Sequence, residues 1–472
     1  LAGFNWGVTQ GFRDFGDLSK FSLIAPAPGN NPANTSVLAT FSRIFPTNGR
    51  VSYTNARLHR TFAKRFDVTA RAIYSVSRSE MEMNERITGR DASNNFVDLD
   101  RFAIFGKSDR IQFRSDVGFT FMITDAARVS NTTTFDRFSI SGDESFEEAL
   151  YRRNAAGNPL ATVTTRSTGY RLKHYRRLTN TAEFDYQFSN RLGFHVGYRY
   201  TKRNADGAGI DTTLTSAPSP TNPLFTGVVE QNTTHAFIGG TKVKPTKNWV
   251  IFADVEKGSA DNVFTRLENY HYTNIRARSR WTFDKLTVNV SAMTKDNTNP
   301  TFTVVAPTVD FTTRIKHRNL SGVVDWTPNS RFGFSGGYTY RYLTSYTPII
   351  VPVTNVLRQG SSQFFVRDHY GFAEVTARVS SRLSFFGAYR VSRDLGQGSR
   401  SSSTIENLIT SYPMRFDTPE VRAAIRLNRN IDWNIGYQYY NYKDIQTSFQ
   451  NYRAHLPYTS IKVYFGNRAL DR

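Results

Sequence analysis

Hydrophobic and polar residues alternate along nearly the whole chain. Between Ile431 and Tyr439 every second residue is apolar, and polar residues or glycine fill the positions between them. The same alternation recurs after Leu192 and after Arg331. A repeat of two residues places successive side chains on opposite faces of a β-strand, whereas a helix repeats every 3.6 residues. The sequence therefore predicts an all-β chain whose strands have one apolar and one polar face.

Short connections and long connections follow one another in alternation along the chain. Short turns are predicted at residues 63–65, 124–127, 189–191, 245–248, 284–285, 328–330, 380–382 and 429–430. Longer polar connections are predicted at residues 15–49, 81–106, 143–168, 205–228, 297–308, 347–361 and 395–412. Eight short-turn hairpins give 16 strands, and one run at each end, at about 2–13 and 450–466, makes 18.

An even number of antiparallel strands, with short periplasmic turns and long outer loops, is typical of barrels in bacterial outer membranes. We therefore expect residues 1–472 to form a single antiparallel transmembrane β-barrel of about 18 strands in the outer membrane of a Gram-negative bacterium. The chain opens at Leu1 inside a strand-like run, without a signal peptide, so we also expect an N-terminal portion to be missing from it.

Aromatic residues favour a membrane over the core of a large soluble β fold, which would alternate in the same way. Four of the five tryptophans stand beside short turns and tyrosines collect toward the opposite strand ends, as two belts of amphipathic rings do at the lipid headgroups. The predicted membrane-interface aromatics are Trp249, Trp281, Trp326, Trp433, Tyr198, Tyr338, Tyr340, Tyr437 and Tyr439. Outer-membrane lipid is the partner that this pattern predicts.

The composition excludes several classes of protein and site. The chain has no cysteine, so it has no disulfide scaffold, no thiolate metal site and no covalently attached haem of its own. Its histidines are scattered without metal-ligand spacing, and we expect no metal and no cofactor of its own. The Gly-x-Ser-x-Gly match at residues 333–337 lies inside an alternating strand and not at a strand-to-helix turn, so we expect no enzyme and no catalytic residue.

The net charge of +21 is spread over one face of many strands, and the sequence contains no nucleic-acid-binding motif. We therefore expect no nucleic-acid partner. The predicted lumen-facing basic wall consists of Arg57, Arg71, Arg114, Arg177, Arg199, Arg276, Arg278, Arg280, Arg341, Arg378, Arg390, Arg422 and Arg426. Either these arginines pair with acidic residues of the same face and stiffen the wall, or they bind an anionic partner or solute. The alternating series Arg276, Arg278 and Arg280 favours the second alternative, because its like charges repel one another unless an anion compensates them.

The hairpin unit resembles that of the MtrB/PioB-like outer-membrane barrels. The resemblance rests on an alternating strand, a short turn with Pro, Asn or Arg, and a second strand ending in Gly-Tyr-x-Tyr. It is found at residues 323–341 and 184–200, and the Gly-Tyr-x-Tyr ending recurs at 436–439. The resemblance covers most of the chain at the level of the repeat. The chain is shorter than typical members and lacks the CxxC that some of them carry near the N-terminus.

Members of that family enclose multihaem c-type cytochromes in electron conduits across the outer membrane. The resemblance therefore implies that this chain is a sheath for such a cytochrome, with haem present only through that partner. The alternative is a diffusion porin that prefers anions, because the polar faces carry an excess of basic residues. A TonB-dependent-type transporter barrel is the third possibility, although no plug domain precedes the first strand.

Overall fold

The computed structural model describes residues 5–28, 37–215, 224–265, 267–300, 311–353, 356–395, 400–401, 413–444 and 451–464. Its elements are β1 (Asn5–Pro28), β2 (Val37–Phe62), β3 (Phe66–Arg90), β4 (Phe96–Met122), β5 (Ala127–Arg153), β6 (Val163–Ser189), β7 (Leu192–Thr215), β8 (Leu224–Thr246), β9 (Trp249–Ala260), β10 (His271–Phe283), β11 (Leu286–Asn299), β12 (Thr313–Asn329), β13 (Phe332–Val353), β14 (Val356–Arg378), β15 (Leu383–Asp394), β16 (Arg400–Ser401), β17 (Met414–Arg426), β18 (Ile431–Asp444) and β19 (Tyr452–Val463). In the described part of the chain, no helix is long and apolar enough to cross a membrane.

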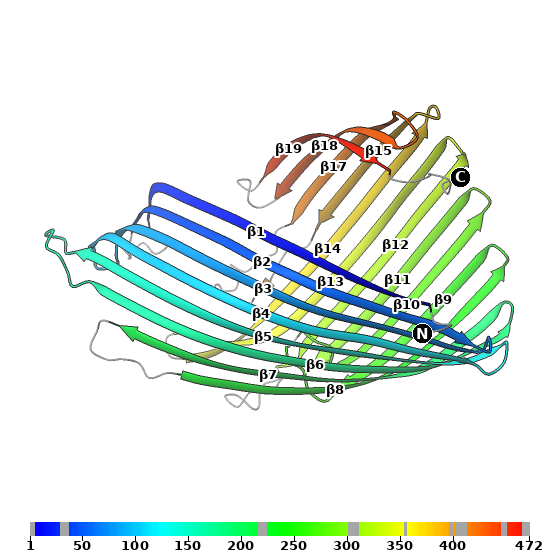
Figure 1. Cartoon of the computed structure of the whole chain (residues 1–472), viewed down its shortest axis with the longest axis horizontal. Helices are drawn as coiled ribbons and strands as arrows, with labels where there is room; N and C mark the ends of the chain where they lie inside the picture. The colour runs from blue at the N-terminus through cyan, green and yellow to red at the C-terminus, as the bar shows by residue number, and fades with distance from the viewer. Residues whose placement is uncertain are drawn as a thin grey trace. The chain divides into compact units, whose positions relative to one another are not determined.

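The chain divides into two compact units that interleave along the sequence. Unit 1 comprises residues 1–123, 129–182 and 200–233, and unit 2 comprises residues 124–128, 183–199 and 234–472. Within unit 1, β1 to β4 pair in chain order as antiparallel neighbours. Within unit 2, each long strand from β8 to β19 pairs antiparallel with the next, and Figure 1 shows these hairpins side by side. The prediction of a single domain over residues 1–472 stays a prediction.

The all-β prediction and the strand count are confirmed. Leaving aside the two-residue β16, the described residues form 18 antiparallel strands. Each predicted short turn falls within a few residues of a tight connection, such as 63–65 between β2 and β3 and 284–285 between β10 and β11. Two-residue turns suit antiparallel neighbours because they return the chain without interrupting the hydrogen-bond ladder.

Five of the seven predicted long connections are wrong over most of their length. Strand ladders continue through most of 15–49, 81–106, 143–168 and 205–228, and β13 and β14 pair up to Val353 and Val356 inside 347–361. Most of the other two stretches, residues 301–308, 396–399 and 402–412, lies outside the described residues. Polar side chains occupy both faces of these strand extensions, which hides the alternation, while the backbone groups remain paired. With 27 residues, β4 is about 90 Å long, far more than the 9 to 11 residues that cross a bilayer.

The apolar side chains are mostly exposed. Six apolar residues are buried in the described part of the chain, and they are Ala127, Ala236, Ala260, Tyr272, Phe311 and Ala388. By contrast, large apolar side chains such as Val421, Phe237 and Ile461 are exposed by 59%, 69% and 66%. A soluble β fold of this length would bury its Leu, Ile and Val between layers. The described residues therefore show no dry core of that kind.

Aromatic rings lie across glycines of the neighbouring strand on the polar face. We call these contacts ring-over-glycine pairs, and they are Tyr53 on Gly11, Phe15 on Gly49, Tyr272 on Gly258, Phe372 on Gly337 and Tyr458 on Gly436. In each pair the two residues stand directly opposite one another in the ladder. A Cβ at any of these glycines would overlap the ring, so only glycine leaves the space that the ring fills.

Asp91 organises the connection between β3 and β4. Its Oδ1 accepts the backbone N–H groups of Ser93 and Asn95, both at 2.9 Å. Its Oδ2 accepts the side-chain amide of Asn95 at 3.0 Å and the Arg152 guanidinium of β5 at 3.2 Å. Burial raises the pKa of Asp91, but the hydrogen bonds from Asn95, Arg152 and Ser93 outweigh it, so the pKa lies below its ordinary value. The ionised carboxylate therefore holds the turn in shape.

We expect Asp91→Asn to loosen this turn. Loss of the charge weakens up to four hydrogen bonds, and local opening should become easier by about 1–2 kcal/mol, or roughly 5- to 30-fold in amide exchange at residues 91–95. Because the folded pKa is lowered, the stabilisation is present at neutral pH and is lost as the pH falls through that pKa. Hydrogen–deuterium exchange measures the effect. Asp143→Asn, at an exposed position of β5, is the matched control. Equal exchange at residues 91–95 in the two variants would contradict the role given to Asp91.

Candidate functional site on the polar face

The predicted interface aromatics of unit 2 share one face, which we call the aromatic face. Trp249 stands directly opposite Trp281, with ring centroids 5.4 Å apart, and Trp326 packs on Phe334 at 5.3 Å. Pair by pair, the register carries this face on to Trp433 in β18. Between the short turns and the tyrosines lies an apolar band. On β11 it consists of Leu286, Val288, Val290 and Ala292.

A tyrosine–histidine contact recurs on the aromatic face. The hydroxyls of Tyr198, Tyr338 and Tyr437 are hydrogen-bonded to Nδ1 of His235, His369 and His455, at 2.5, 2.6 and 2.6 Å. The rings of Tyr340 and Tyr439 each lie 5.0 Å from the same His369 and His455. Each Gly-Tyr-x-Tyr ending thus has a histidine partner on the next strand. The assignment of these tyrosines to a membrane interface stays a prediction.

All thirteen predicted arginines lie on the opposite face of their strands, which we call the polar face. In unit 1, Arg57 and Arg71 are directly opposite each other, and Asp116 is opposite Arg71. Arg114 lies 3.5 Å from Asp116. Arg177 donates to Thr179 at 3.3 Å. Arg71 and Arg114 therefore share one acidic neighbour, Asp116, as the pairing alternative expects.

In unit 2, ion pairs join acidic residues to arginines of other strands. Arg390 lies between Glu374 at 2.7 Å and Glu420 at 3.1 Å, and all three are half-buried or nearly buried. Arg199 binds Glu256 at 3.0 Å, and Arg426 lies 3.8 Å from Asp432. For these residues the structure supports stiffening of the wall by ion pairs.

The series Arg276, Arg278 and Arg280 is compensated in part. Asp254 stands directly opposite Arg276 and lies 3.9 Å from Arg278. Arg278 also lies over the ring of Phe252, at 5.4 Å. Arg280 faces Val250 on one side and Asn289 on the other. Asp254 therefore compensates Arg276 and Arg278, whereas Arg280 faces neutral residues.

The last three arginines of the set lie on β13, β14 and β17. Arg378 stands opposite Ser384, and Arg422 lies over the ring of Phe386 at 4.9 Å. Arg341 stands opposite Asn319 on one side and Asp368 on the other. The Asp368 carboxylate accepts the Ser392 hydroxyl at 3.1 Å.

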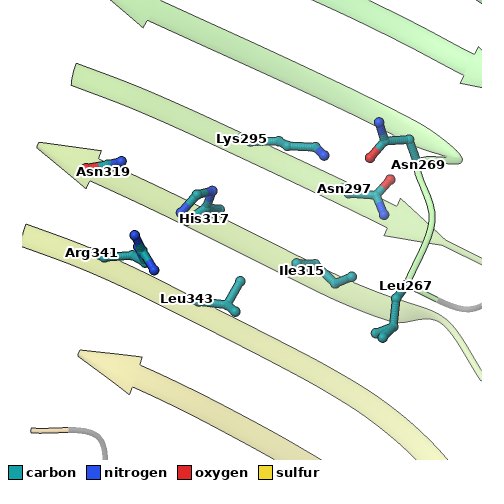
Figure 2. Close-up of a pocket in the computed structure, with 9 residues that line it drawn as sticks. All are labelled: Leu267, Asn269, Lys295, Asn297, Ile315, His317, Asn319, Arg341 and Leu343. Atoms are coloured by element: carbon teal, nitrogen blue, oxygen red, sulfur yellow. The ribbon is translucent and has the colours of Figure 1, made fainter. Parts of the chain in front are cut away.

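A cavity of about 390 Å³ opens beside Arg341 on the polar face of β11, β12 and β13. Figure 2 shows Lys295, His317 and Arg341 on these three neighbouring strands, with Leu267 and Asn269 on the segment that precedes β10. Lys295 and His317 stand directly opposite one another. The segment before β10 is fixed to β11 because Asn297 donates to the Glu268 carbonyl at 2.7 Å and accepts the Tyr270 N–H at 2.9 Å.

Among the described residues, the cavity is lined by three basic side chains and by no carboxylate. Its remaining lining residues are asparagine, leucine and isoleucine, and the buried Oδ1 of Asn319 has no hydrogen-bond partner among the described residues. Lys295 and His317 lie beyond the apolar band, level with Asp296 and Arg318 of the opposite face. Burial lowers the pKa of both groups, and Arg341 and Lys295 lower that of His317 further. An anion bound in this cavity would offset the repulsion among the basic groups and raise the pKa of both Lys295 and His317.

Sequence reasoning found Arg341 and missed Lys295 and His317. Both fall on the polar positions of their strands, so the alternation contained their orientation. The sequence gives no sign of which segment covers them, because Leu267 and Asn269 lie in a connection without a two-residue repeat. Whether side chains of three strands come close together depends on the register of the strands, which the turns of the hairpins set.

The sequence matches no protein-family model and no curated protein. Among solved structures, the chain is similar to the ferric-catecholate import receptor Fiu from E. coli K12, with 9% identity, 98% of this chain and 82% of that chain covered, and a TM-score of 0.48. It is also similar to the ferric yersiniabactin uptake receptor FyuA from Yersinia pestis, with 9% identity, coverage of 97% and 80%, and a TM-score of 0.45. It is similar as well to the siderophore receptor PiuA from Acinetobacter baumannii, with 10% identity, 94% of this chain and 80% of that chain covered, and a TM-score of 0.40.

Proposed function

We propose that the chain is a transmembrane β-barrel of a bacterial outer membrane that passes small anionic solutes along its polar face. One observation carries the proposal. Eighteen two-faced antiparallel strands leave their large apolar side chains exposed in place of burying them in a core. An exposed apolar face of this extent is stable against hydrocarbon, and strands satisfy their backbone groups in hydrocarbon only within a closed sheet.

Anions are the solute class that the polar face favours. The ion pairs of Arg199, Arg390 and Arg426 compensate part of the wall, whereas no carboxylate of the described residues lines the cavity beside Lys295, His317 and Arg341. A positive potential at the wall raises the local concentration of anions and lowers that of cations. We place solute recognition at this cavity.

Planar-bilayer recordings test this function. The purified protein should conduct ions and show a reversal potential of anionic sign in a potassium chloride gradient. The double variant Lys295→Gln/Arg341→Gln should lower the ratio of anion to cation permeability by about twofold or more, because two charges leave the wall. The current itself should persist.

The matched control is Lys316→Gln/Arg318→Gln. These residues flank His317 in β12 but belong to the aromatic face, so the same loss of charge should leave the reversal potential unchanged. Absence of current from the unmodified protein would refute the proposed function. Equal shifts in the two double variants would refute the recognition site.

The cytochrome sheath that the resemblance to MtrB/PioB-like barrels implies stays a prediction, because no contact of the described residues tests it. A purified sheath would carry c-type haem absorbance from its partner, whereas the proposed anion pathway would be colourless. Absorbance of the protein isolated from its native membrane separates the two functions in one measurement.

A further inference from the structure

Three basic residues stand in a row on the aromatic face of unit 2. Arg393 in β15 is directly opposite Arg415 in β17, and Arg415 is directly opposite Lys443 in β18. We call these three residues the basic row. Residues directly opposite in an antiparallel pair have Cβ atoms about 5 Å apart, and like charges at that distance are destabilising. All three side chains are exposed.

Two more arginines adjoin the basic row. Arg453 of β19 stands opposite Asn441, two residues before Lys443, and Arg367 of β14 lies two residues from His369, which is opposite Arg393. In the described part of the chain, Asp417 is the carboxylate that pairs with this group, through Arg415 at 2.9 Å. The Asp417 carboxylate is already engaged, because it also accepts the Tyr389 hydroxyl at 2.9 Å and the Asn441 amide at 3.2 Å.

The basic row lies at the edge of the apolar band. Toward the short turns, the same face of these strands carries Tyr389, Val421 and Tyr437, which are exposed by 44%, 59% and 39%. An apolar surface that ends in a row of cations matches an amphiphile with acyl chains and an anionic head. Phosphate groups suit arginine in particular, because the guanidinium fork binds two phosphate oxygens at once.

We propose that the basic row binds the phosphate groups of an anionic membrane lipid whose acyl chains lie along the apolar band. The inference rests on the proposed placement of the chain in an outer membrane. It assigns to the aromatic face a lipid site distinct from the solute pathway of the polar face. The bound phosphates supply negative charge beyond that of Asp417, which pairs with Arg415 alone of the three cations.

Binding of labelled diphosphoryl lipid A to the detergent-solubilised protein tests the site. The unmodified protein should bind this lipid in preference to phosphatidylcholine. The double variant Arg393→Gln/Lys443→Gln leaves the Arg415–Asp417 pair intact and should bind it about 25-fold more weakly, since each basic residue near an anionic lipid surface contributes roughly fivefold. Lys285→Gln/Arg429→Gln removes the same charge from the short turns and should bind like the unmodified protein.

Equal binding by the two double variants would overturn the lipid site. Competition by millimolar inorganic phosphate as effective as that by lipid A would also overturn it, because the site would then recognise free phosphate without the acyl chains. Both results are readable in protein that conducts in planar bilayers. They are therefore distinct from failure of the proposed function, which shows as absence of current from the unmodified protein.

Discussion

Val324→Arg should prevent stable insertion of the protein into membranes. Val324 lies on the aromatic face of β12, within the apolar band between Trp326 and Arg318, and its side chain is 44% exposed. A guanidinium on the hydrocarbon side of a barrel strand costs about 2 kcal/mol or more. We expect a large loss of folded protein in the outer-membrane fraction, measured by heat-modifiable migration on gels and by urea unfolding from liposomes.

The neighbouring residue provides the control. Val323 has the same side chain on the same strand, but it belongs to the polar face, where Asn289 and Gly337 stand opposite it. Val323→Arg should therefore insert and unfold like the unmodified protein, within about 0.5 kcal/mol. If Val323→Arg is the more damaging of the two, the aromatic face is not the one that contacts hydrocarbon.

Arg390→Met should give the second large effect, a loss of about 2–3 kcal/mol in the free energy of unfolding. The substitution leaves Glu374 and Glu420 facing each other across β15 without the cation that separates them. Removing one partner of a buried ion pair costs 3–5 kcal/mol, and partial exposure of these groups reduces that figure by about 1 kcal/mol or more. Urea unfolding of the protein in detergent micelles measures it.

Arg422→Met is the matched control for Arg390→Met. The Arg422 guanidinium lies on the same face over the ring of Phe386, a contact worth about 0.5–1 kcal/mol. Adding Glu374→Gln to Arg390→Met should restore part of the lost stability, because one of the two opposed carboxylates becomes neutral. Equal losses in Arg390→Met and Arg422→Met would show that the ion pairs contribute nothing beyond packing.

The alternation predicted strand type, face and number because these depend on the chain locally. Trp433 and Arg422 could be placed on opposite faces from parity alone, and register later confirmed it. The lengths of the strands could not be predicted in the same way. Residues 15–28 and 37–49 carry polar side chains on both faces, so their ladder leaves little trace in the hydropathy pattern.

The site required information that local patterns do not contain. Lys295, His317 and Arg341 are separated by 22 and 24 residues in the sequence, and their meeting depends on how three strands align. Parity states that each lies on the polar face, but alignment decides whether His317 faces Lys295 or a residue two positions away. The basic row depends on alignment in the same way, since Arg393, Arg415 and Lys443 come from three strands.

The ring-over-glycine pairs bear on how such a chain reaches the correct alignment during assembly. A slip of two residues would keep every side chain on its proper face. The difference in polarity between the two faces therefore does not disfavour such a slip. After such a slip, however, Tyr458 would stand opposite Asn434 or Gln438 in place of Gly436. The side chain of either residue would overlap the position of the tyrosine ring. The five pairs lie in four hairpins, and in each of these they favour the native alignment over neighbouring alignments that hydrophobicity alone would accept.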